Sequence, residues 1–528
     1  MIRSILISST GLASLLALSA LVGCSGDRGR SAQERDTPDS SVATEGGVLV
    51  DAAVEEAQPI PMDGGGWSGD AGGWFGDGGT CIGRDAGPKG KQLIGSATVS
   101  VLGLTNDDQV VYVDTTSNTI FAVPAAGGTP ASIGPTQGSV QLPGDAVFDW
   151  TGLDSSGAVA TTFRTWTSAQ GPHVLTGAFL VGAADSSSDG SRVLYMDGAT
   201  ASTADLYVAQ MDGSGKTRLA TGIPWSQNCP PTVSFIGSSA LLGYCTTAPT
   251  DPAAAVGTLQ LYVGASGAGT TVSTNAKLNS TDTTGAYVLF GSSGGLFVAN
   301  ATTGATVQID ATGASGAFTN DGQSVLYVTT NGSIKRSPIG VSSPVTLVAG
   351  GGFSGVSAIS PDDRWVLAFR GIDPNTGDVD IELASATTPG ASTSILATES
   401  GSFSGNPFTS DSSRVLYVDT STGSADDYYA VPTIGGAGVK LAAGVWLGIA
   451  TSGAKVVFDG NFVPNAGLQG QGVTDLESVD TSASPPTPTL LVSQADPGLY
   501  FTSNGDSLVY SVTSCAGGSA GIWVMPTP

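Results

Sequence analysis

The stretch from Asp185 to Gly222 reads DSSSDGSRVLYMDGATASTADLYVAQMDGSGKTRLATG. It contains a polar turn at 188–190, apolar runs at 193–195 and 206–208, a Gly-rich turn, and a short closing run near Leu219. Short runs rich in β-branched and aromatic residues, separated by Gly, Asp and Ser, are typical of antiparallel strands joined by tight turns. The stretch therefore predicts one small antiparallel sheet.

The same phrase of turn and strand recurs along the chain, at intervals of roughly 35 to 52 residues, which is the range of four-stranded propeller blades. Most copies are followed by a second apolar run, such as LYVA or YYAV, and by a third that closes the unit, such as TRLATG. The copies are NDDQVVYV (106–113), SSGAVATT (155–162), SDGSRVLYM (188–196), GSSALLGY (237–244), TTGAYVLF (283–290), NDGQSVLYV (320–328), PDDRWVLAF (361–369), SDSSRVLYV (410–418), TSGAKVVF (451–458) and SNGDSLVY (503–510).

This phrase resembles the repeats of TolB-type β-propellers. The resemblance lies in S-x-D-G-x-x-[VIL]-x-[YF], then LYV, D-G-S-G and a short closing strand, and it covers about residues 92–528. It is strong at 185–222, 318–348 and 405–443, and weak at 145–176, where the segment after SSGAVATTFRTW is too short for two clear strands. It implies an all-β fold: a single closed β-propeller whose strand before each turn lines a central channel. Ten copies predict eight to ten four-stranded blades, and two smaller rings are the alternative.

The two ends of the repeat region predict how the ring closes. The segment GKQLIGS (90–96) matches closing strands such as GVKLAAG but has no repeat of its own, while the last repeat stops at Pro528 with three strands. We expect residues 91–95 to pair with residues 521–525 and complete the last blade. Such a pairing seals two sheet edges that would otherwise invite aggregation.

The N-terminus has the pattern of an export signal. Arg3 precedes an apolar stretch at 5–22, which is typical of a secretory signal peptide. The ending L-V-G-C resembles the bacterial lipobox, and this implies a signal peptide at 1–23, cleavage before Cys24 and acylation of Cys24. Ser25 in place of Asp implies, by analogy with enteric lipoproteins, the outer membrane. Residues 24–89 lack apolar periodicity and are rich in Gly and Asp, so we expect a flexible tether before the propeller at 90–528.

Four cysteines follow the lipidation site: Cys81, Cys229, Cys245 and Cys515. An even number in an exported chain predicts two disulfides, with three pairings open. The expected ring closure places Cys81 near Cys515. We therefore predict the pairs Cys81–Cys515 and Cys229–Cys245.

Composition limits the classes of partner and chemistry. The 528 residues carry a formal net charge of −25 with a pI near 4.1, which argues against nucleic acid and against a basic membrane patch. The segment GSGKT (213–217) lacks the first Gly of a phosphate loop and is not followed by a helix. The segment GSSGG (291–295) matches a serine-hydrolase pattern but joins two expected hairpin strands, and His173 is the single His for any nucleophile.

Acidic residues supply the remaining candidates. Five lie on or beside the expected inner strands and are candidates to line the channel, where paired carboxylates could cleave a glycan: Asp145, Asp149, Asp154, Asp185 and Asp282. A second set offers oxygens at nearly alternate positions, as calcium loops do, although position twelve is Ala384 rather than Glu: Asp373, Asn375, Asp378 and Asp380. Apart from this calcium candidate we expect no cofactor and no metal. The acidic residues of the repeated turns are expected to bond nearby backbone N–H groups.

These observations favour a non-enzymatic, monomeric envelope module that is anchored by its N-terminal lipid and binds a protein partner. The resembled family implies the protein partner, because its propeller binds a periplasmic lipoprotein. A glycan-active hydrolase or lyase that uses channel carboxylates is the main alternative, and an envelope spacer is the third. A channel carboxylate pair near Trp150 would favour the enzyme, whereas an apolar face patch would favour a protein partner.

Overall fold

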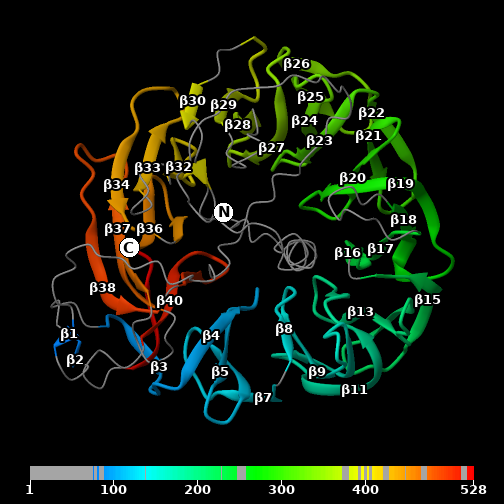
Figure 1. Ribbon diagram of the computed structural model, residues 1–528, viewed down its shortest axis with the longest axis horizontal. Coiled ribbons are helices and arrows are strands. Elements are labelled where there is room, and N and C mark those ends of the chain that lie inside the picture. Colours follow the sequence, from blue (N-terminus) through cyan, green and yellow to red (C-terminus); the bar gives the residue numbers. More distant parts are fainter. Residues whose placement is uncertain are drawn as a thin grey trace, which may run out of the picture.

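The computed structural model describes residues 75–76, 80–81, 88–136, 138–226, 229–246, 257–370, 380–390, 394–397, 401–402, 407–419, 427–445, 447–464, 472–496, 498–512 and 520–528. Within these residues the chain is all-β, apart from one 3-10 turn, η2 (Val263–Ala265). The strands form antiparallel sheets that follow one another around a ring, in the order of the sequence (Figure 1). The fold is therefore a repeat of small sheets, as the sequence predicts.

Eight sheets have four strands, and one has seven. In the first part of the ring these are β4 (Val99–Leu104), β5 (Gln109–Asp114), β6 (Thr119–Pro124) and β7 (Ala131–Pro135); β8 (Ser139–Gln141), β9 (Ala146–Leu153), β10 (Val159–Thr167) and β11 (Gly171–Leu180); and β12 (Ala184–Ser186), β13 (Arg192–Asp197), β14 (Thr203–Gln210) and β15 (Thr217–Pro224). The seven-stranded sheet has β16 (Thr232–Ile236), β17 (Ser239–Tyr244), β18 (Gly257–Tyr262), β19 (Thr270–Thr281), β20 (Tyr287–Ser292), β21 (Gly295–Asn300) and β22 (Thr306–Asp310).

The second part of the ring continues the same pattern. Its sheets are β23 (Gly313–Phe318), β24 (Ser324–Thr329), β25 (Ile334–Pro338) and β26 (Val345–Val348); β27 (Phe353–Ile359), β28 (Trp365–Arg370), β29 (Asp380–Ser385) and β30 (Ser394–Ala397); β31 (Gly401–Ser402), β32 (Arg414–Asp419), β33 (Asp427–Pro432) and β34 (Val439–Ala443); and β35 (Leu447–Ala450), β36 (Lys455–Pro464), β37 (Gly472–Asp480) and β38 (Thr489–Ala495). The last has β39 (Tyr500–Phe501), β40 (Ser507–Val512), β41 (Gly521–Pro526) and β3 (Lys91–Ile94), and a separate pair is β1 (Phe75–Gly76) with β2 (Thr80–Cys81).

The hydrophobic core lies between neighbouring sheets rather than inside any one of them. One cluster joins Leu416 and Tyr428 of the β31–β34 sheet to Val456 and Phe458 of the β35–β38 sheet. The second strand of a sheet is buried on both faces, as in β24, where all six residues are buried. Outer strands such as β34 expose their first residues. This is why the second strands read as continuous apolar runs in the sequence.

A pair of aromatic rings marks the same register position in many sheets. The fourth residue of the second strand lies opposite a residue of the third strand, and we call these two residues the ladder pair. In four sheets the two rings stack with centroids 5.4–6.0 Å apart: Tyr112–Phe121, Tyr195–Tyr207, Phe290–Phe297 and Tyr417–Tyr429. Tyr510–Trp523 takes the same register in the last sheet. Cross-strand aromatic pairs of this kind stabilise a sheet by about 0.2–1 kcal/mol each.

The two ends of the repeat region meet as predicted. β3 pairs with β41 through Lys91↔Val524, Gln92↔Trp523 and Ile94↔Ile522, and in Figure 1 the first sheets of the chain lie beside the last. The buried Tyr510 hydroxyl donates to the Lys89 carbonyl (2.6 Å) and accepts from the Lys89 N–H (2.8 Å). The N-terminal strand is therefore held by backbone pairs and by a side chain 421 residues away.

The alignment of the second repeat copy, within residues 145–176, was wrong. That segment forms β9, β10 and most of β11, with β8 as the inner strand. The copy SSGAVATT was placed one hairpin too late, because its turn joins the second strand to the third. The turn that matches the other copies lies at 143–145, where Gly144 O accepts from Asn106 N in the preceding sheet (2.9 Å).

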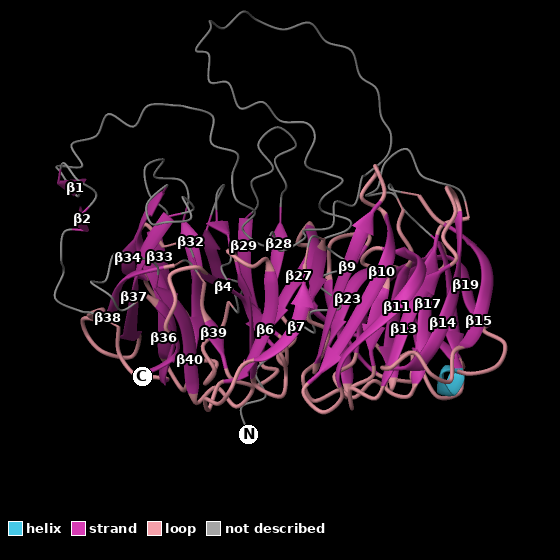
Figure 2. Cartoon of the chain, turned by 90° about the horizontal axis from the view of Figure 1, so that it is seen from below, coloured by secondary structure: helices cyan, strands magenta, loops and turns pink. Residues whose placement is uncertain are grey.

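The ring has two unlike faces. The turns that join the first and second strands bond to those that join the third and fourth, as in Ala125 N to Asp108 O (2.9 Å) and Thr433 N to Ser413 O (3.0 Å). We call the face that carries both kinds of turn the turn face. It is the lower side in Figure 2, where η2 lies. The opposite loop face carries the connections between second and third strands. In the described part of the chain no helix is long and apolar enough to cross a membrane.

Candidate functional site

The inner strands would line any channel, and their charge is low. The first strand of each sheet lies closest to the ring centre, as β4, β8 and β27 show in Figure 1. Within the inner strands that the structure describes, the charged side chains are Asp185 on β12 and Lys277 on β19. β23 (GASGAF) and β27 (FSGVSAI) instead consist of uncharged residues, most of which are small. Acid–base chemistry in the channel would therefore depend mainly on Asp185.

The Asp185 side chain on β12 connects its sheet to the next one through hydrogen bonds. Its carboxylate accepts from Ser186 N (2.7 Å), from Ser234 Oγ (3.0 Å) and from Phe235 N (2.7 Å), the last two on β16. Burial raises the pKa of Asp185 to about 7, against the effect of these hydrogen bonds. A buried carboxylate that accepts three donors from the fold has little capacity left for a substrate.

Asp149 lies on β9, the second strand of its sheet, directly beside the inner strand β8. Arg164 Nη1 contacts Asp149 Oδ2 at 2.7 Å and also donates to Pro135 O (2.9 Å), while Thr136 Oγ1 donates to Asp149 Oδ1 (2.7 Å). Burial raises the pKa of Asp149, and Thr136 and Arg164 partly offset this. This ion pair occupies the ladder position of its sheet (Asp149↔Arg164), so it replaces the aromatic rings found elsewhere.

The other three predicted residues are in turns. Asp145 precedes β9, and burial together with the Asp107 carboxylate raises its pKa. Asp154 is exposed after β9 and accepts from Ser156 Oγ and from the N–H groups of residues 158 and 159, and these bonds lower its pKa. Asp282 follows β19 and accepts from Tyr287 N (2.6 Å) and Thr284. Each of the five carboxylates has its own partners, and no partner is shared between them.

The acidic turn residues do bond their own backbone, as expected. In five turns a Ser or Thr hydroxyl donates to an Asp two residues later at 2.5–2.7 Å: Thr105–Asp107, Ser187–Asp189, Thr319–Asp321, Ser360–Asp362 and Thr409–Asp411. Four of these Asp side chains also accept a backbone N–H two residues further on. The hydrogen bonds satisfy backbone groups inside the turn, which is a structural role.

Sequence reasoning missed three residues that tie these turns to one another. Asp108, Asp363 and Ser412 have φ of 61°, 58° and 61°, at the turn position where Gly190 and Gly322 stand in other sheets. Each side chain reaches the preceding sheet: Asp108 accepts from Ser503 N (2.6 Å), Asp363 from Asn320 N (2.7 Å), and Ser412 Oγ from Asp362 N (3.1 Å). A non-glycine residue where the repeat favours Gly was the signal in the sequence.

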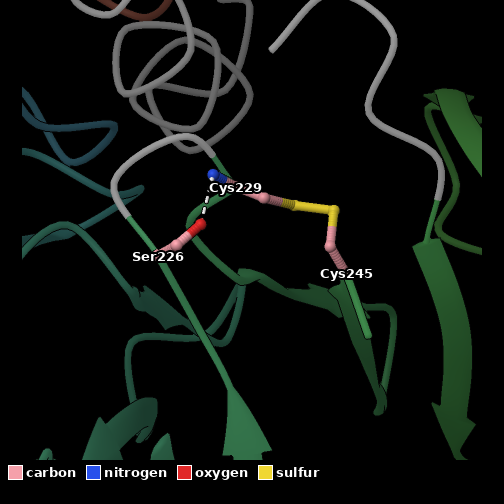
Figure 3. Close-up of a disulfide and its surroundings, with 3 residues drawn as sticks. All are labelled: Ser226, Cys229 and Cys245. Atoms are coloured by element: carbon pink, nitrogen blue, oxygen red, sulfur yellow. Dashed lines mark hydrogen bonds between the residues drawn. A yellow bond between two sulfur atoms is a disulfide. The ribbon is translucent and has the colours of Figure 1, made fainter. Parts of the chain in front are cut away.

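One predicted disulfide is present. Cys229 and Cys245 are bonded, with Cα atoms 6.1 Å apart, and both are buried. The bond joins the segment before β16 to the end of β17, and Ser226 Oγ accepts from Cys229 N (3.2 Å) beside it (Figure 3). The bridge therefore fixes the start of the seven-stranded sheet. Cys24, Cys515, the side chain of Cys81, and Asp373, Asn375 and Asp378 lie outside the described residues, whereas Asp380 begins β29.

His173 lies on β11, and in the next sheet hydrogen bonds from Ser214 lower the pKa of the exposed Asp212. Ser292 and Gly295 of the GSSGG segment end β20 and begin β21, so the segment is a hairpin turn. Among the described residues, no group of three or more His, Cys, Asp and Glu side chains is placed to hold a metal ion.

No protein family model matches the chain, and no curated protein matches it in sequence. Solved structures that resemble it include a eukaryotic initiation factor (12% identity, 67% of this chain and 90% of that chain, TM-score 0.43) and a prolyl endopeptidase (14%, 74% and 55%, TM-score 0.35). A putative TolB from Agrobacterium tumefaciens is 16% identical over 49% of this chain and 94% of that one, with a TM-score of 0.25. The chain spans about half the length of the prolyl endopeptidase and of a tricorn protease. With similarity this low, the fold assignment rests on the sheet topology.

Proposed function

We propose that the chain is a lipid-anchored envelope β-propeller that binds a protein partner and has no catalytic role. Residues 1–23 are its signal peptide, Cys24 carries the lipid, and residues 24–89 form the tether to a single closed ring at 90–528. The ring has ten blades. Eight are the four-stranded sheets, and two are halves of the seven-stranded sheet, which share the long β19 because it pairs with both β18 and β20.

The exposed apolar side chains carry the proposal. Among the described residues, most of the large exposed hydrophobic side chains lie at the outer rim of the turn face, in turns between third and fourth strands or on the fourth strands themselves: Val174, Val263, Val341, Val345, Ile434 and Val439. Ile434 is 87% exposed and Val341 is 51% exposed. These side chains belong to four different sheets, and two pairs, Val341 with Val345 and Ile434 with Val439, each lie at one turn between a third and a fourth strand. Each pair offers a partner a small apolar contact on the same face, surrounded by polar side chains.

The placement of the carboxylates supports binding over catalysis. The most buried of the predicted channel residues are Asp149, Asp185 and Asp282. Asp149 is already paired with Arg164, and Asp185 already accepts hydrogen bonds from β16. A glycosidase needs two carboxyl groups within about 10 Å of each other across one glycosidic bond. The five candidates instead accept hydrogen bonds from separate turns and junctions of the fold, which is a structural role.

A photo-crosslinking experiment tests the proposal. A photoreactive residue replaces Ile434 on the turn face, or Thr116 on the loop face as the matched control, in the full chain expressed in its own envelope. We expect a single stoichiometric protein adduct from position 434 that is not formed from position 116. The variant Ile434→Glu should keep the melting temperature and lose the adduct formed by a probe at Val341. Adducts of equal yield from both faces, or turnover of a glycan panel by the purified chain, would overturn the proposal.

A further inference from the structure

One sheet has a buried carboxylate in its ladder pair instead of stacked rings, and this points to a ligand. In the β27–β30 sheet the ladder pair is Ala368↔Glu382, where Tyr417↔Tyr429 stands in the next sheet. Ala368 and Glu382 are both completely buried. A methyl group opposite a carboxylate fills much less space than two stacked rings, and the carboxylate brings charge into a position that is apolar in five other sheets.

Only one of the two oxygens of the Glu382 carboxylate has a hydrogen-bond partner. Its Oε1 accepts from Arg370 Nη1 at 2.7 Å, and the Arg370 side chain is 45% exposed. Its Oε2 is buried and has no hydrogen-bond partner. A buried carboxylate oxygen without a partner is costly, because burial removes the water that would otherwise solvate its charge. A bound cation is one way to restore that solvation.

A second carboxylate lies on the same face of the same strand. Asp380 is two residues before Glu382 on β29, and side chains two residues apart in a strand share a face, roughly 7 Å apart along it. Asp380 lies directly opposite Arg370 in the register, and both carboxylates raise the pKa of Arg370. The cluster therefore carries two negative charges against one positive charge, and its net charge favours a cation.

We propose that Asp380 and Glu382 bind a Ca²⁺ ion at the loop-face end of the β27–β30 sheet. Two carboxylates supply up to four oxygens and water completes the shell, which calcium tolerates because its coordination geometry is flexible. Arg370 stays on Oε1 and holds the Glu382 side chain so that Oε2 faces the ion. With so few protein ligands we expect a dissociation constant of roughly 0.1–1 mM, the range of extracellular calcium modules. This inference stands independently of the proposed protein partner.

Calcium titration of the full chain tests the site. Isothermal titration with CaCl₂ after chelation should give one saturable event, and the melting temperature should rise with calcium concentration. Both effects should be lost in Glu382→Gln. Glu477→Gln is the matched control, because Glu477 holds the ladder position of the β35–β38 sheet opposite an aromatic ring, Phe458. That control should bind calcium as the wild type does.

The variant Ala368→Tyr provides a second test, because it restores the residue that stands at this position in five other sheets. We expect it to fold with an intact far-UV circular dichroism spectrum and to bind no calcium. The proposal is overturned if the wild type shows no saturable binding up to about ten times the expected range, or if Glu382→Gln binds as tightly as the wild type.

Discussion

Ring closure through Tyr510 gives the sharpest prediction. The Tyr510 hydroxyl makes two hydrogen bonds to the backbone of Lys89, at 2.6 and 2.8 Å, and so holds the residues just before β3 from a buried side chain. The substitution Tyr510→Phe removes both bonds and leaves the ring in place. Because Lys89 is exposed, water can solvate its freed backbone groups, so we expect local opening of the N-terminal strand rather than unfolding of the last sheet.

The size of the effect follows from the two bonds. A net intramolecular hydrogen bond contributes about 0.5–1.5 kcal/mol, so their loss should destabilise the docked strand by about 1–3 kcal/mol. Since 1.4 kcal/mol corresponds to a factor of ten, the open population should rise roughly 5- to 150-fold. The β3–β41 backbone pairs at Lys91, Gln92 and Ile94 remain and limit the opening.

Trypsin measures this population directly, because Lys89 and Lys91 are cleavage sites within the opening segment. When opening is fast relative to cleavage, the cleavage rate follows the open population. Fragments from these two sites, quantified by mass spectrometry, should appear faster in Tyr510→Phe by the factor above. Tyr112→Phe, at the same strand position in the first sheet, is the control. Cleavage at the wild-type rate in Tyr510→Phe, or equal acceleration in Tyr112→Phe, would refute the closure argument.

Four further predictions concern individual side-chain contacts. Asp108→Ala should lower the free energy of unfolding in urea more than Asp108→Gly by about 1 kcal/mol, because Ala keeps the strained positive φ while both lose the bond to Ser503; equal effects would contradict this. Burial raises the pKa of Asp185 above its unfolded value to about 7, so its contribution to stability is full below pH 4 and lost as the pH rises to 7, by up to about 4 kcal/mol. Urea titrations across this range should show the loss in the wild type and a flatter profile in Asp185→Asn, and parallel profiles would count against it. Arg164→Met should destabilise the protein by about 3–5 kcal/mol because it leaves Asp149 buried without its partner, and the double variant with Asp149→Leu should recover much of the loss in thermal melts. Replacing Cys229 and Cys245 by Ser should lower the free energy of unfolding by about 3 kcal/mol, measured against the wild type with and without reductant.

Periodicity alone predicted much of the architecture. The recurrence of a polar turn before a run such as RVLYM identifies the second strands, because a strand buried on both faces must be apolar throughout. The match between KQLI and VKLA identified β3 as a closing strand. Residues 145–176 were aligned incorrectly, because any apolar strand that follows a Gly-containing turn matches the repeat pattern. Only the strand pairing shows that the turn at 154–157 joins the second strand to the third.

What the sequence by itself determined is local: the strands, the tight turns and the repeat that sets their order, because each of these depends on residues that are neighbours in the chain. What only the tertiary structure decided is which side chains meet across sheets. Asp185 with Phe235, Asp108 with Ser503, and Glu382 with its half-satisfied carboxylate could not be read from spacing. The physical reason is that the free energy of a carboxylate depends on burial and on donors brought from distant segments, and both arise only when the sheets pack into a ring.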